Sequence, residues 1–184
     1  MAHYACLAAS ALLLLPAAAS AHRLDEYLQA TTIGLSRDHI ALHLRLTPGV
    51  DVAEGIIRQI DINSDGILSS AEQHAYITRM TRNLSASLNG KPLFLTLESA
   101  TFPPPTAIRG GTGVLDLRFT IQAPLQNGPN RLTYTNRGAG PETVWLVNCL
   151  LPQDPDLHVL QQRRSRDQSD YQLDFTLTPR KTAN

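Results

Sequence analysis

Residues 115–122 read Leu115-Asp116-Leu117-Arg118-Phe119-Thr120-Ile121-Gln122, in which apolar and polar side chains alternate strictly. Successive side chains of a β-strand point to opposite faces of a sheet, so this pattern predicts a strand with one face in a core. Residues 40–46 and 171–177 show the same alternation. The repeat of two residues, rather than 3.6, predicts a domain built mainly from half-buried strands.

Further short segments complete the predicted sheets. Segments 84–88 and 93–97 flank Asn89-Gly90, a dipeptide that tolerates positive φ at both positions and favours a type I′ hairpin turn. The other expected strands are 27–35, 131–135, 144–150 and 157–160. Eight or nine short strands separated by turns rich in Gly and Pro predict an antiparallel, immunoglobulin-like β-sandwich.

Residues 51–84 interrupt the strand pattern. Asp51, followed three residues later by Glu54, predicts a capping box that opens a short helix with a helical stripe of apolar residues. Ser69 and Glu72 form a second such pair in front of a helix predicted over 70–82. The sequence therefore predicts a helix–loop–helix insertion in the β-domain.

The twelve residues between these helices read Asp61-Ile62-Asn63-Ser64-Asp65-Gly66-Ile67-Leu68-Ser69-Ser70-Ala71-Glu72. They match the pattern D-x-[DN]-x-[DN]-G-x5-E, in which glycine occupies the position that requires positive φ. This segment resembles the calcium loop of the EF-hand family, and the resemblance covers residues 51–84. It implies that Ca²⁺ is bound by six residues: Asp61, Asn63, Asp65 and Glu72 through side chains, Ile67 through its carbonyl, and Ser69 through a water.

EF-hands usually occur in pairs, but the sequence contains no second loop of this pattern. Leu68, the apolar residue at loop position 8, must then be covered by the β-domain or by another copy of the protein. We therefore expect calcium to order an interaction module rather than to operate a paired sensor. We expect an affinity on the order of 10⁻⁴–10⁻³ M, as in extracellular modules.

Composition excludes several classes of function. The 184 residues contain 16 Lys+Arg and 16 Asp+Glu, so the chain lacks the excess positive charge typical of nucleic-acid binders. The sequence has no H-E-x-x-H, G-x-S-x-G, P-loop or C-x-x-C motif. Gly110-Gly111-Thr112-Gly113 precedes a predicted strand, which indicates a flexible loop rather than a phosphate cradle. We predict a protein that is not an enzyme.

The N-terminus resembles a secretory signal peptide. Residues 1–21 contain no acidic residue, a leucine-rich run over 7–15, and Ala19-Ser20-Ala21 before the expected cleavage site. Cleavage after Ala21 would deliver residues 22–184 to the periplasm or the exterior, and we expect no transmembrane segment in this mature chain. It would also leave Cys149 as the single cysteine, in an apolar context that indicates a structural role.

A second resemblance extends over most of the mature chain. Residues 22–29, 46–50 and 147–152 are similar to segments of exported bacterial proteins and of the extracytoplasmic N-terminal region of hydrogenase/urease accessory-type membrane proteins. The resemblance implies a periplasmic β-domain that carries an inserted EF-hand. It also suggests a periplasmic or membrane protein as the partner, whereas the oligomeric state stays open.

An alternative function rests on the processed N-terminus. If cleavage follows Ala21, the free amino group and imidazole of His22 could chelate Cu(II) or Ni(II), with a second histidine completing the site. His39, His43, His74 and His158 are the available partners. This arrangement would make the protein a transition-metal binding or delivery protein.

Overall fold

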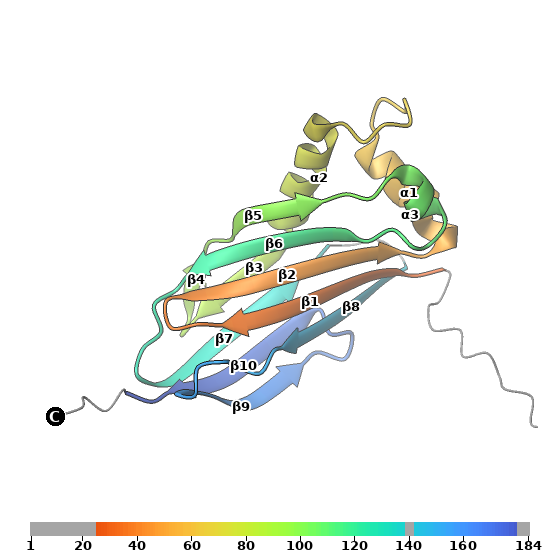
Figure 1. Cartoon of the computed structure of the whole chain (residues 1–184). Coiled ribbons are helices and arrows are strands. Elements are labelled where there is room, and N and C mark those ends of the chain that lie inside the picture. The colour runs from red at the N-terminus through yellow and green to blue at the C-terminus, as the bar shows by residue number, and fades with distance from the viewer. Residues whose placement is uncertain (1–24, 139–141, 180–184) are drawn as a thin grey trace, which may run out of the picture.

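The computed structural model describes residues 25–138 and 142–179 (Figure 1). The predicted signal peptide (1–21) and His22 lie outside the described residues. Within them the chain forms ten strands and three helices. These are β1 (Tyr27–Leu35), β2 (His39–Pro48), α1 (Val50–Ile60), α2 (Ser70–Arg82), β3 (Leu84–Leu88), β4 (Lys91–Leu93), β5 (Thr96–Thr101), α3 (Pro105–Arg109), β6 (Leu115–Gln122), β7 (Gly128–Asn136), β8 (Thr143–Cys149), β9 (Leu157–Arg164) and β10 (Asp170–Leu177).

The strands form two five-stranded sheets, in the orders β5-β6-β2-β1-β8 and β4-β3-β7-β10-β9. This arrangement confirms a mainly β chain with two layers. Strand pairing is antiparallel apart from β1 and β8, which run parallel over Tyr27 to Ile33 and Thr143 to Cys149. We predicted a fully antiparallel sandwich, and the structure differs at this pair. There β8, which is far from β1 in the sequence, adds to the edge of the sheet in the parallel direction.

One hydrophobic core lies between the sheets and continues under the helices. The alternation over 115–122 is confirmed, because Leu115, Leu117, Phe119 and Ile121 of β6 are at most 1% exposed. Polar groups also join the two layers: the hydroxyls of Thr31 and Tyr134 are hydrogen bonded at 3.0 Å. The inner faces of both sheets thus provide the apolar surface whose burial drives folding.

The hairpin at Asn89-Gly90 is confirmed, with φ of 52° and 80° at the two positions. The single strand predicted over 93–97 is wrong. The chain leaves one sheet at the end of β4 and enters the other at the start of β5, and Phe94 between them is 88% exposed. Both strands share a repeat of two residues, so the sequence pattern runs through the crossover without a break.

The loop predicted at 110–113 follows α3, a short helix that the sequence pattern did not predict. Ile108 of α3 is fully buried, and the N–H groups of Thr112 and Gly113 both donate to the Ala107 carbonyl, at 3.1 and 2.9 Å. In Figure 1 α3 lies beside α1, on the same side of the sheets. The segment after β5 therefore starts with a short helix beside α1, and residues 110–113 form the loop that leads from this helix into β6.

Within the described residues, no helix is both long and apolar enough to cross a membrane. The longest helix, α2, has 13 residues, whereas a transmembrane helix needs about 20. Its buried side chains, Tyr76, Ile77 and Met80, instead join the core of the domain.

Cys149 at the end of β8 is partly buried and packs against the core, which fits the structural role predicted for it. Burial raises the pKa of its thiol to about 11. The thiolate, which is the reactive form, is therefore scarce at neutral pH.

We expect iodoacetamide at pH 7.5 to alkylate Cys149 at least about tenfold more slowly in the folded protein than in urea, because unfolding restores an ordinary thiol pKa. Mass spectrometry of timed samples measures this rate. Equal rates in the two states would show that folding neither shields the thiol from the reagent nor raises its pKa.

Candidate metal centre

The helix that leads into the loop, α1, is amphipathic and buries Ala53, Ile56, Ile57 and Ile60. The capping box predicted at its start is wrong. The N-cap is Gly49, no side chain caps the helix, and Asp51 lies in the first turn, where its charge favours the helix dipole. The Glu54 carboxylate instead accepts a hydrogen bond from Arg109 of α3.

The capping box in front of α2 is confirmed. The hydroxyl of Ser69 accepts from the Glu72 N–H at 3.4 Å, and the Glu72 carboxylate accepts from the Ser69 N–H at 3.0 Å. The box fixes the first turn of α2 and with it the direction of the Glu72 side chain. Residues 69–72 thus serve both as a helix start and as the last part of the predicted metal loop.

Side chains in the first half of the loop point inward and bind its backbone. Asp61 accepts from the N–H groups of Asp65 and Gly66, at 3.2 and 2.9 Å. The amide nitrogen of Asn63 donates to Asp65 at 2.9 Å, and Asp65 also accepts from the Ile67 N–H at 2.8 Å. The structure therefore places Asp61, Asn63 and Asp65 around one turn, where their side chains bind one another and the backbone.

Glu72 closes the loop from its other end. One carboxylate oxygen accepts from the N–H groups of Ile62 and Asn63, at 2.9 and 3.4 Å, and the other accepts from the Ser69 hydroxyl at 2.6 Å. These hydrogen bonds, with that from Ser69 the strongest, lower the pKa of Glu72, so the carboxylate is charged at neutral pH. Its bonds join loop positions 2 and 3 to position 12.

Two residues of the loop have positive φ, Ser64 at 60° and Gly66 at 80°. A Cβ added to Gly66 would meet no atom within 4 Å, so space is not what requires glycine there. The requirement comes from the left-handed backbone, which a side chain disfavours. This turn aims the N–H groups of Asp65 and Gly66 at Asp61.

Leu68 is 9% exposed and belongs to the core of its own chain. We predicted that either the β-domain or a second copy covers this side chain. In the structure its own chain covers it. Ile62 and Ile67, by contrast, are 65% and 66% exposed on the outside of the loop. The loop is anchored by one apolar side chain and presents two others to solvent.

The chemistry of the loop fits a hard cation. Asp61 is 5% exposed, yet in the described part of the chain no basic side chain pairs with Asp61, Asp65 or Glu72. Three carboxylates, an amide, a hydroxyl and the Ile67 carbonyl provide only oxygen ligands, the type that Ca²⁺ prefers. The Ile67 carbonyl accepts from the Ser69 N–H at 3.1 Å and keeps a second lone pair.

The carboxylates would need to turn toward an ion. Over residues 25–138 and 142–179, no three His, Cys, Asp or Glu side chains are grouped so that they could hold a metal as they stand. In the 61–72 loop this follows from the hydrogen bonds above, because each carboxylate is directed at backbone N–H groups. Rotation of the Glu72 side chain would exchange these bonds for metal contacts.

The histidines predicted as partners of His22 lie apart or are paired locally. His39 is hydrogen bonded to Asp38 at 2.8 Å, and His43 of β2 to Asp116 of β6 at 2.6 Å. His74 lies on α2 and His158 on β9, in the other sheet. The transition-metal site stays a prediction that depends on a residue outside the described part.

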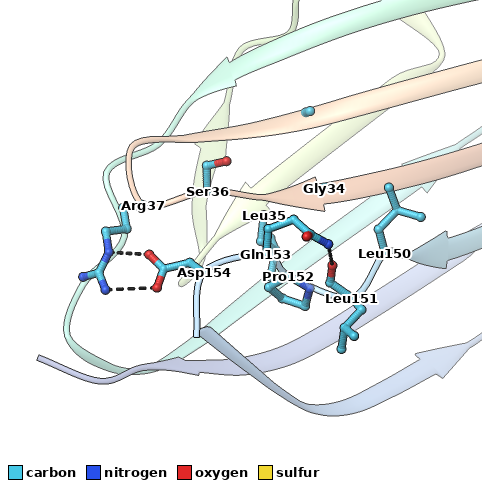
Figure 2. Close-up of a pocket in the computed structure, with 10 residues that line it drawn as sticks. Gly34, Leu35, Ser36, Arg37, Leu150, Leu151, Pro152, Gln153 and Asp154 are labelled. Atoms are coloured by element: carbon cyan, nitrogen blue, oxygen red, sulfur yellow. Dashed lines mark hydrogen bonds and ion pairs between the residues drawn. The ribbon is translucent and has the colours of Figure 1, made fainter. Parts of the chain in front are cut away.

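A hollow of about 570 Å³ at the end of β1 is another concave feature of the protein (Figure 2). Its charged groups are already neutralised, since the Arg37 guanidinium donates to Asp154 at 2.5 Å and also binds Asp156. Leu150 and Leu151 at its rim are 58% and 83% exposed. It offers an apolar rim and an ion pair, whereas the 61–72 loop offers carboxylates that no basic side chain pairs with in the part of the chain that the structure describes.

Comparison with known proteins finds no matching protein-family model and no matching curated protein. The case for function therefore rests on the geometry and chemistry of the chain itself.

The structure adds one residue that the sequence analysis did not single out. Arg79 of α2 donates a hydrogen bond to the Gln59 carbonyl of α1. A backbone acceptor has no side-chain signature, so only the spacing of Tyr76 and Arg79, one helical turn apart, could have suggested it.

Proposed function

We propose that the protein binds one Ca²⁺ ion through the 61–72 loop, which acts as a single EF-hand between α1 and α2. Asp61, Asn63, Asp65 and Glu72 would contribute side-chain oxygens, Ile67 its carbonyl, and Ser69 a water-mediated contact. The observation that carries the proposal is a loop of oxygen ligands in which three carboxylates have no basic partner among residues 25–138 and 142–179. A bound divalent cation would supply the missing positive charge.

The role proposed for the ion is to order the helical insertion. Helices of 11 and 13 residues, such as α1 and α2, are marginal in isolation, so much of their stability must come from packing and from the loop. Calcium would add stability because it binds the folded loop and not the unfolded chain. The ordered insertion would then present a surface to a partner protein.

We also propose that this module functions outside the cytoplasm, with a periplasmic or membrane protein as its partner. The predicted signal peptide supports this location, and the affinity that we expect for a single loop would suit it. Calcium outside the cytosol can be high enough to fill a site whose dissociation constant is about 10⁻⁴–10⁻³ M.

Isothermal titration calorimetry of residues 22–184 tests the proposal directly. We expect one Ca²⁺ per chain, and a weaker response to Mg²⁺, which favours six ligands at shorter distances and keeps its waters. A titration without binding heat, repeated by equilibrium dialysis at 5 mM calcium with the same result, would exclude this function.

A further inference from the structure

The last turn of α1 is tied to α2 by one side chain. A helix ends with four carbonyls that have no partner within the helix, and in α1 these belong to residues 57–60. The Ile57 carbonyl accepts from the Asp61 N–H at 2.8 Å, and the Gln59 carbonyl accepts from the guanidinium of Arg79. A cation at this end also interacts favourably with the dipole of α1. Arg79 thus holds the backbone two residues before Asp61.

Arg79 itself is held by an anchored aromatic ring. Its guanidinium carbon lies 5.6 Å from the ring centroid of Tyr76, a cation–π arrangement. Tyr76 is 2% exposed, its hydroxyl is hydrogen bonded to that of Tyr27 at 2.6 Å, and its ring packs edge-on against Phe102 at 6.1 Å. Tyr27 belongs to β1 and Phe102 follows β5, so the ring is fixed to the β-domain from two directions.

From this chain of contacts we propose that Arg79 is a positioning residue for the metal loop. It fixes the end of α1, which carries Asp61, relative to α2, which carries Glu72 in its first turn. In a paired EF-hand, the second hand helps to hold the loop. Here the contact between Arg79 and α1 would provide part of that support from the same chain. This inference rests on the proposed function and adds a residue that would not itself touch the ion.

The chemistry requires arginine at this position. A planar guanidinium can lie over the Tyr76 ring and donate to the Gln59 carbonyl at the same time. A lysine keeps the charge but is a compact ammonium without this planar fork. Arg82, one turn further along α2, is exposed, and its removal changes the net charge by the same amount.

Calorimetric titration of the full mature chain with CaCl₂ tests the inference in four proteins: wild type, Arg79→Ala, Arg79→Lys and Arg82→Ala. Removal of a side chain that binds a metal ligand typically weakens metal affinity 10- to 100-fold. Arg79 acts on Asp61 only through the backbone of α1, so we expect the dissociation constant of Arg79→Ala to rise about tenfold, the lower end of that range. Arg79→Lys should fall between Arg79→Ala and wild type. Arg82→Ala should stay within about twofold of wild type, because it removes charge without removing the contact.

A second measurement does not depend on calcium. Hydrogen exchange without metal should be faster for the amides of residues 57–66 in Arg79→Ala than in Arg82→Ala, while the β-strands of both variants keep their protection. That protection also shows that the variant is folded.

The two proposals fail separately. If wild type binds calcium and Arg79→Ala binds it as tightly as Arg82→Ala, Arg79 does not position the loop, and the calcium proposal stands. If wild type does not bind at millimolar calcium, the calcium proposal is wrong and the role of Arg79 falls with it.

Discussion

Replacing Glu72 with glutamine should abolish the stabilisation of the protein by calcium while leaving its metal-free fold intact. Wild type at 10 mM Ca²⁺, with a dissociation constant of about 10⁻⁴ M, should gain about 2.7 kcal/mol in free energy of unfolding. Glutamine has one neutral amide oxygen where glutamate offers two charged oxygens to the ion. Differential scanning calorimetry with and without calcium measures the difference as a shift in Tm.

Glutamine is informative at this position because it separates the metal from the helix cap. Glu72 accepts from the Ser69 N–H in the capping box, and glutamine at the same position of a helix makes the same bond. A loss of stability without calcium is therefore expected to be small. A larger loss would mean that the charge of Glu72 mainly serves the loop amides of Ile62 and Asn63.

Glu98→Gln on the exposed β5 strand is the matched control, since it removes the same charge far from the loop in sequence. It should respond to calcium as wild type does. If Glu72→Gln and wild type show equal calcium-dependent shifts, the 61–72 loop is not the metal site.

The sequence predicted the features that depend on neighbouring residues. The alternation over 115–122, the Asn89-Gly90 turn and the Ser69–Glu72 capping box each follow from side chains within a few residues of one another. The structure has all three. The predicted box at Asp51 and Glu54 failed because Glu54 binds Arg109, a residue 55 positions away. The local pattern predicts a cap, but it contains no information about Arg109, which binds Glu54 in the folded chain.

The same distinction applies to the candidate metal centre. Its six predicted residues lie in one loop of twelve, so the hydrogen bonds between its carboxylates and its backbone need only a local turn with Gly66 at positive φ. The support for the loop is assembled from β1, α2 and the segment after β5, through Tyr27, Tyr76 and Phe102. These are apolar or aromatic residues of ordinary spacing, and their role appears only when the sheets bring them together.

Substitution of Gly113, which packs against α3, should also have a large effect on the stability of the protein. A Cβ at this position would lie 2.7 Å from the Ile108 nitrogen and 2.9 Å from the Ala107 carbonyl carbon, closer than van der Waals contact allows. Both neighbours are backbone atoms of α3, so they cannot move away as a flexible side chain would. The Gly113 N–H also donates to the Ala107 carbonyl at 2.9 Å, and any shift that relieves the clash would weaken this bond.

We therefore expect Gly113→Ala to lower the free energy of unfolding by about 1–3 kcal/mol, the usual cost of overpacking. Gly55→Ala is the opposite case, because a Cβ at that position in α1 meets no atom within 4 Å. There the substitution should raise stability by about 0.5–1 kcal/mol, since alanine loses less backbone entropy than glycine in a helix. Urea unfolding in calcium-free buffer compares the two variants with wild type. If Gly113→Ala is as stable as wild type or more stable, the close fit of Gly113 against α3 does not limit the stability of this region.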